Sequence, residues 1–147
     1  MTSRSASGFL FFAYDGRIDD AAMKAVNPAC DKMGPSKAEG RCLLFTDQGV
    51  PNLGLNPDEH VWGMLWVVPA IEMANLDQWA AERGLRREVV MIICPAGPKV
   101  PATAYLNASA PAGDPNPQEL QGIIHAASNA KIDAGYIAKL RRAAAAV

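Results

Sequence analysis

The sequence lacks several features by which protein classes are recognised. Its 147 residues carry a net charge of −1, so no large basic surface for nucleic acid is expected. No apolar run approaches the roughly 20 residues that cross a bilayer, and the longest, residues 8–14, lacks the cleavage region of a signal peptide. These absences predict a cytoplasmic protein that acts without nucleic acid or a membrane.

Motifs for metals and cofactors are also missing. The three cysteines form no C-x-x-C pair, which favours reduced thiols over disulfides or a zinc site. His60 and His125 do not have metal-ligand spacing; we expect His60 in a solvated turn and His125 as a partly buried structural residue. No G-x-x-x-x-G-K-[ST] loop or G-x-S-x-G motif occurs. We therefore expect no metal and no cofactor.

The composition is that of a protein with an ordinary core. Half of the residues are hydrophobic, and the length suits one domain over residues 1–147. A small-molecule substrate is the partner that these features leave open, and a homodimer is compatible with them.

Apolar runs and turn residues predict the order of the elements. Helices are expected from Asp19 or Asp20, from Pro69 to Gly84, and in the C-terminal part over 117–130 and 133–143. Gly34–Ser36 is predicted as a loop and Gly49–Gly54 as an irregular link. Strands are predicted over residues 9–14, 41–45, 61–68, 87–94 and 101–106. Strands in the middle followed by helices indicate an α+β fold.

One segment combines a turn with charged side chains. Tyr14-Asp15-Gly16-Arg17 follows a strand and precedes a helix, a connection that directs backbone N–H groups toward one point. Arg17 would add a charge-assisted fork for an anion. The alternative is an ordinary strand–turn–helix connection without a ligand.

These residues resemble a known family in their order. Residues 11–18 resemble the first strand and Y-G-S-N-[LM] loop of the gamma-glutamylcyclotransferase superfamily, and residues 60–66 resemble its V-x-G-x-L-[YW] strand. Further similar segments follow in the same order: Gly40–Phe45, Leu76–Ala80 for L-D-x-[YH]-E, Leu85–Val90 for Y-R-R-x-x-V, Ala102–Tyr105, and the terminal helices over 117–140.

The resemblance implies a fold and a reaction. The fold would be a small mixed-sheet barrel flanked by helices. The Y-G-S-N loop would hold a gamma-glutamyl group by backbone donors, and a glutamate would move a proton from the substrate amine to the leaving amine, releasing 5-oxoproline. Such intramolecular attack needs mainly positioning, an oxyanion cradle and one carboxyl group.

The chain departs from the family pattern at both functional places. Ala80 stands where the family has its glutamate, and a methyl group cannot carry a proton. In the loop, Asp15, Gly16 and Arg17 replace Gly, Ser and Asn, so that Tyr14 alone keeps its identity. The fold is therefore expected to carry over, whereas the standard cyclotransferase reaction is not.

Two carboxylates are candidates for the missing acid. Asp15 lies in the loop that borders the expected cavity. Glu82 lies two residues beyond Ala80, which turns it about 200° around a helix. We therefore predict Asp15 and Glu82 as catalytic, and the following residues as substrate-binding: Tyr14, Gly16, Arg17, Ile18 and Tyr105.

The predicted function is a diverged gamma-glutamylcyclotransferase-like enzyme. It would perform cofactor-free acid–base chemistry (cyclisation, hydrolysis, isomerisation or a lyase reaction) on a small polar metabolite at the Tyr14–Arg17 loop. The alternative is a non-catalytic ligand-binding or assembly protein of the same fold.

Overall fold

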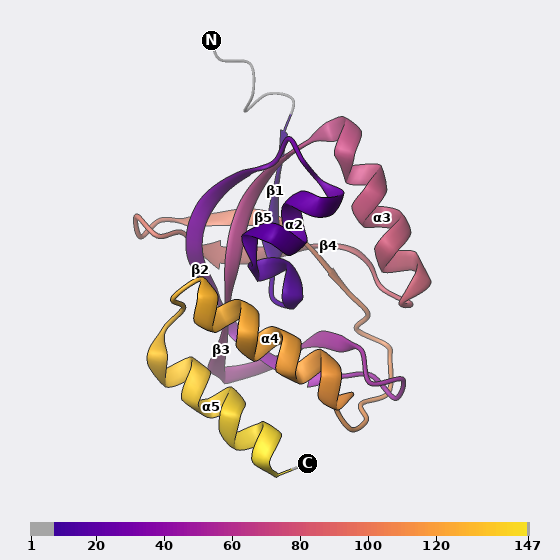
Figure 1. The fold of residues 1–147 in the computed structure, drawn as a ribbon, viewed down its shortest axis with the longest axis vertical. Coiled ribbons are helices and arrows are strands. Elements are labelled where there is room, and N and C mark those ends of the chain that lie inside the picture. The colour runs from indigo at the N-terminus through magenta and orange to yellow at the C-terminus, as the bar shows by residue number, and fades with distance from the viewer. Residues whose placement is uncertain (1–7, 147) are drawn as a thin grey trace.

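A computed structural model describes residues 8–146 and contains a closed barrel with helices around it (Figure 1). The strands follow the order β1-β3-β2-β4-β5 around the barrel, and β5 closes it by pairing in parallel with β1. Their bounds are β1 Gly8–Ala13, β2 Asp31–Phe45, β3 Pro51–Pro69, β4 Arg86–Ile93 and β5 Lys99–Leu106. The predicted α+β class and mixed-sheet barrel are confirmed.

A long hairpin of β2 and β3 corrects two of the sequence predictions. Gly34–Ser36 is not a loop but part of β2, and most of Gly49–Gly54 belongs to the start of β3. The register of the two strands shifts between Lys32 and Gly34, and Gly34 has a φ of 134°. A bulge tolerates glycine and proline within a strand, so these residues mark a bend here rather than an end.

Gly63 allows β3 to cross β1 at close range. The strand β1 pairs antiparallel with β3, placing Ala13 opposite Met64 and Phe12 opposite Leu65. A Cβ added at Gly63 would lie 2.2 Å from the Ala13 carbonyl oxygen and 2.8 Å from the Phe12 ring. The close approach of the two strands therefore requires a glycine at this position.

The helix α3 (Met73–Glu82) covers one side of the barrel. Pro69 does not open it: Pro69 ends β3, and the short 3-10 helix η2 (Ala70–Glu72) lies between. Gly84 ends it as predicted, with a φ of 76°. The N–H groups of Leu85 and Gly84 donate to the carbonyls of Ala80 and Ala81, which is the Schellman arrangement.

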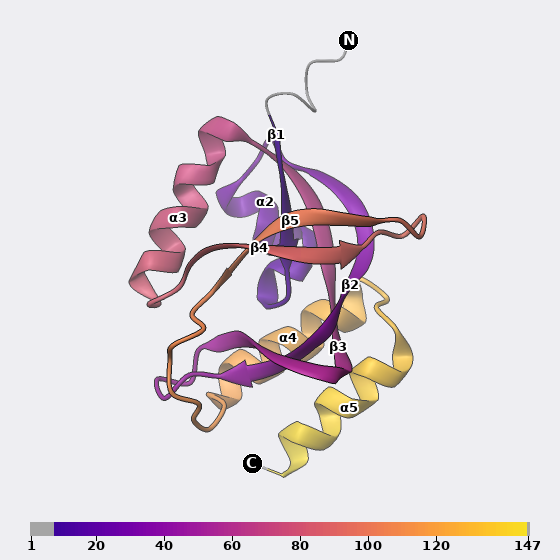
Figure 2. The same ribbon diagram turned by 180° about the vertical axis from the view of Figure 1, so that it is seen from behind.

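The remaining helices flank the loop after β1 and the lower part of the barrel (Figure 2). They are η1 (Gly16–Ile18), α2 (Asp20–Val26), α4 (Pro117–Asn129) and α5 (Ala134–Ala145). Asp19, Asn116 and Asp133 cap α2, α4 and α5 with their side chains. His125 is exposed on α4, so its prediction as a partly buried residue is wrong. No helix within residues 8–146 is long and apolar enough to span a bilayer.

Candidate functional site

Tyr14 lies at the end of β1 and fixes three strands to one another. Its side chain is buried, and its hydroxyl donates to the Tyr105 carbonyl at 2.5 Å, with the Pro51 carbonyl at 3.4 Å. Burial, and next the charge of Asp15, raise the pKa of Tyr14 well above its usual value. Tyr14 is therefore a neutral donor whose hydrogen bond is already used within the protein.

The Asp15 side chain shapes the loop that follows. Its carboxylate accepts the Arg17 N–H at 3.0 Å, and its carbonyl accepts the Ile18 N–H at 3.0 Å. Two of the donors that the sequence assigned to a ligand are thus satisfied inside the loop. An added Cβ at Gly16 would meet nothing within 4 Å, so that side of the loop is open. Ile18 as a whole is fully buried, and its N–H is already used within the loop.

Asp15 borders a small cavity between β1, β5 and α3. Tyr14, Tyr105 and Trp79 line it with Asp15, and its volume is about 10 Å³. A site of that size holds about one water molecule. The structure therefore brings Asp15, Tyr14 and Tyr105 together, as predicted from the sequence, but around a narrow space.

Arg17 stacks on Trp79, one of the residues that line this cavity. Its guanidinium lies 3.9 Å from the indole centroid, and that of Arg83 lies 5.0 Å away. Arg83 is neutralised, because both of its terminal nitrogens donate to Glu119 at 3.0 Å. In contrast, the Arg17 Nε is buried and has no partner among the described residues. Arg17 thus differs from Arg83, because among the described residues no carboxylate accepts a hydrogen bond from its guanidinium.

The environment of Arg17 affects its charge little. Burial lowers the pKa of Arg17, and the Asp15 carboxylate opposes this shift. A guanidinium remains protonated at neutral pH even so. A desolvated cation with an unused donor binds a carboxylate more strongly than a solvated one does.

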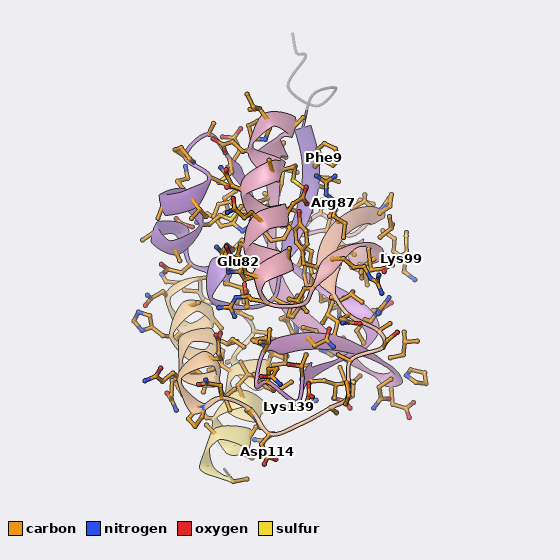
Figure 3. The ribbon with its side chains drawn as sticks, turned by 90° about the vertical axis from the view of Figure 1, so that its right-hand side faces the viewer. Phe9, Glu82, Arg87, Lys99, Asp114 and Lys139 are labelled. Carbon is orange, nitrogen blue, oxygen red and sulfur yellow. The ribbon has the colours of Figure 1, made fainter. Side chains whose placement is uncertain are left out.

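An open cleft extends from Arg17 along α3. Arg17, Trp79 and Glu82 line this cleft, which has a volume of about 390 Å³. Figure 3 shows Glu82 at the end of α3, on the side of the helix away from Arg87. Ala80 is completely buried. The structure therefore places Glu82 with Arg17 in this cleft and Asp15 in the small cavity, and Trp79 lines both spaces.

A hydrogen-bonded network supports the Tyr105 wall of the cavity. The Tyr105 hydroxyl donates to Asp77 at 2.6 Å, and Arg87 donates to both Asp77 oxygens at 2.7 and 2.8 Å. Arg87 also lies over the Phe9 ring, 5.1 Å from its centroid (Figure 3). Burial raises the pKa of Tyr105, and the bond to Asp77 raises it further. This network ties α3 to β4 and β5.

The network makes a contribution to stability that depends on pH. The hydrogen bond from Arg87 lowers the pKa of Asp77, so the stabilisation is present at neutral pH and is lost as the pH falls through the folded-state pKa. We expect Asp77→Asn to be less stable than the wild type at pH 7, by less than about 1 kcal/mol since the pair is partly solvated. Urea unfolding at pH 7 and pH 3 measures this; a difference that does not shrink at pH 3 contradicts it.

Sequence reasoning missed three residues of this site. Trp79 is half-buried, and the guanidinium groups of Arg17 and Arg83 both lie over its ring. Arg83 and Glu119 are 36 positions apart, and nothing in the sequence pairs them. Within residues 8–146, no group of three or more His, Cys, Asp or Glu side chains has an arrangement that would hold a metal ion.

Solved structures with the same fold include cyclotransferases. A gamma-glutamyl cyclotransferase superposes with a TM-score of 0.82 at 21% identity, over 91% of this chain and 86% of that one. An uncharacterized human protein superposes with a TM-score of 0.83 at 20% identity, over 92% of this chain and 87% of that one. A mouse AIG2-like protein superposes with a TM-score of 0.57 at 15% identity, over 69% of this chain and 78% of that one. At these sequence identities, the structural similarity shows that this chain shares the fold of these proteins.

The sequence itself matches one family. No curated protein matches it significantly. Residues 60–140, more than half of the chain, match the family model of the AIG2-like family. With the fold, this confirms the predicted resemblance: the chain belongs to the AIG2-like family and has the gamma-glutamylcyclotransferase fold.

Proposed function

We propose that this protein is a diverged gamma-glutamylcyclotransferase-like enzyme that performs acid–base chemistry on a small molecule bearing a carboxylate. The substrate carboxylate binds Arg17 in the cleft beside Trp79. The reacting group lies toward Asp15, which takes a proton from the attacking group of the substrate and returns a proton to the leaving group. The reaction is a cyclisation, hydrolysis, isomerisation or lyase step.

The observation that carries this proposal is the state of Arg17. Its guanidinium is held on the Trp79 ring, and its buried Nε has no partner among residues 8–146. A buried donor without an acceptor costs free energy, which a bound carboxylate would recover. The terminal nitrogens of the neighbouring Arg83 already have an acceptor, because Glu119 accepts their hydrogen bonds.

Asp15 is better placed than Glu82 to act as the acid–base group. Asp15 is half-buried and borders the cavity together with Tyr14 and Tyr105. Glu82 is exposed at the end of α3, where water competes for every proton transfer. Catalytic carboxylates work best where solvent is partly excluded, which supports Asp15. Opening the narrow cavity requires a movement of Trp79, the side chain that lines both the cavity and the cleft.

The experiment is a substrate survey with a matched variant. Wild type is tested against gamma-glutamyl amines, small amides, lactams and lactones, each with and without a carboxylate. We expect turnover of a carboxylate-bearing compound, and in Arg17→Gln a KM about tenfold higher or more, since a charge-assisted hydrogen bond is lost. Equal KM values in the two proteins would contradict the role of Arg17.

A second candidate function is ligand binding without catalysis. The complete burial of Ala80 at the position of the family glutamate favours it, because no proton-transfer group can enter there. The same survey separates the two candidates. Calorimetric binding of a carboxylate that Arg17→Gln abolishes, without turnover of any compound, would support the binding protein and contradict the enzyme.

A further inference from the structure

A second cleft opens at the seam of the barrel, where β2 and β4 diverge. The two strands pair at Lys37 and Ile93. Beyond that pair, β2 continues to Phe45 alongside β3, whereas β4 stays paired with β5 back to Arg86. The space between them has a volume of about 360 Å³. Pockets of about 300–1,000 Å³ are typical of sites for small molecules.

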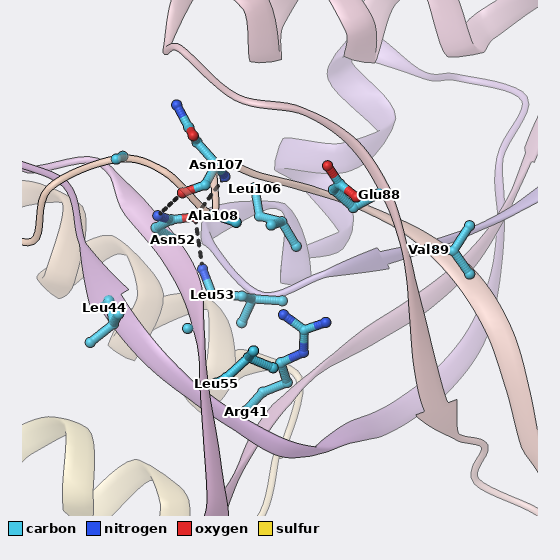
Figure 4. Close-up of a pocket in the computed structure, with 12 residues that line it drawn as sticks. Arg41, Leu44, Asn52, Leu53, Leu55, Glu88, Val89, Leu106, Asn107 and Ala108 are labelled. Carbon is cyan, nitrogen blue, oxygen red and sulfur yellow. Dashed lines mark hydrogen bonds between the residues drawn. The ribbon is translucent and has the colours of Figure 1, made fainter.

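Opposite charges face this cleft from its two walls. Arg41 on β2 and Glu88 on β4 both line it (Figure 4). Neither has an ion-pair or side-chain hydrogen-bond partner within the part of the chain that the structure describes, residues 8–146. Some other charged side chains of the barrel are paired, as Lys99 is with Glu39 at 3.6 Å. The cleft therefore holds a free cation and a free anion at once.

Apolar side chains lie between these charges. Leu53 and Leu106 are almost completely buried beneath the cleft, whereas Leu55 is 79% and Val89 70% exposed at its sides. Figure 4 shows Leu53 and Leu106 between the strand that carries Arg41 and the strand that carries Glu88. Exposed aliphatic side chains beside a concave surface are favourable contacts for an apolar group.

The remaining wall of the cleft is rigid. The Asn52 side chain accepts the Asn107 N–H at 3.0 Å and donates to the Asn107 carbonyl at 2.9 Å. The Asn107 side chain in turn donates to the Gly84 carbonyl at 3.0 Å. These bonds fix the segment after β5, so that the wall is formed before a ligand arrives.

We propose that the seam cleft binds a free α-amino acid with a branched apolar side chain. Its carboxylate pairs with Arg41, its ammonium group pairs with Glu88, and its side chain covers Leu55 and Val89. A singly charged ligand would leave one of the two protein charges desolvated and unpaired, which is unfavourable. A zwitterion satisfies both. This site is separate from the Arg17 cleft and does not depend on the function proposed there.

Calorimetric titration of the full chain tests the site, with L-leucine as the probe. We compare it with 4-methylpentanoate, which lacks the ammonium group, and L-leucinamide, which lacks the carboxylate. Leucine should bind saturably, and each analogue should bind about tenfold more weakly or worse because one charge-assisted contact is missing. Arg41→Gln should weaken the binding of leucine but not that of leucinamide. Glu88→Gln should weaken the binding of leucine but not that of 4-methylpentanoate. Arg86→Gln, an exposed change on β4 outside the cleft, is the control.

Several outcomes would overturn the proposal. Equal affinities of leucine and 4-methylpentanoate would show that the ammonium group is not recognised and would indicate a simple anion site. Absence of saturable binding would remove the site altogether. Loss of leucine binding in Arg17→Gln, with full binding in Arg41→Gln, would place the amino acid in the other cleft. In contrast, lost leucine binding in Arg41→Gln, with full binding in Arg17→Gln, supports two separate sites.

Discussion

The Asp15→Asn variant is expected to lose about 100-fold or more in kcat, because removing a positioned acid–base group has an effect of that size. The KM should change little. Asparagine has nearly the same shape, and its Oδ1 can still accept the Arg17 N–H that Asp15 accepts at 3.0 Å. The loop and the position of Arg17 should therefore be kept, while the proton-carrying group is lost.

A matched control separates chemistry from structure. Asp19→Asn makes the same replacement four residues along the chain, where Asp19 caps α2 by accepting the Ala22 N–H at 3.3 Å. This variant should retain the wild-type kcat. If Asp15→Asn also retains it while Glu82→Gln does not, the acid–base group is Glu82 and the assignment to Asp15 is wrong.

The Gly63→Ala variant should be destabilised by about 3 kcal/mol, the upper part of the range for overpacked cores. Its new methyl group would lie 2.2 Å from the Ala13 carbonyl oxygen. That atom belongs to the backbone of β1, which is held by pairing with β3 on one side and β5 on the other. Neither β1 nor β3 can move aside without breaking the hydrogen bonds between paired strands.

Urea unfolding measures this loss, with Gly122→Ala as the control. Gly122 lies inside α4, and an added Cβ there meets nothing within 4 Å. That change should stabilise the protein by about 0.5–1 kcal/mol, because alanine favours helix over glycine. Equal stability of Gly63→Ala and the wild type would show that β1 and β3 can separate at this point.

Local patterns predicted most of the helices and strands, whereas the barrel was implied by the resemblance to the family. The apolar run at 9–14, Gly84 at the end of α3, and the capping residues before the last helices each depend on a few neighbouring residues. The errors arose where proline and glycine occur inside strands. At Gly34 and Pro35 the strand β2 continues through residues that normally end a strand, since pairing between β2 and β3 outweighs local preference.

The site was predicted only in part. Asp15, Arg17 and Tyr105 were predicted because they lie in segments that resemble the family, and their roles stay predictions. The position of Trp79, which lines both the cavity and the cleft, and the neutralisation of Arg83 by Glu119 depend on contacts between elements distant in the chain. The narrowness of the cavity likewise follows from side-chain packing that no local pattern encodes.

The most direct test of the account is the NMR signal of the Arg17 Nε–H group during titration with glutarate, a dicarboxylate that has no amine and cannot cyclise to a lactam. Absence of one signal in Arg17→Gln assigns it. Because this buried donor has no partner among the described residues, a bound carboxylate should shift the signal saturably. An unchanged Arg17 signal at concentrations that saturate glutarate binding, or no binding at all, would contradict a carboxylate site at Arg17.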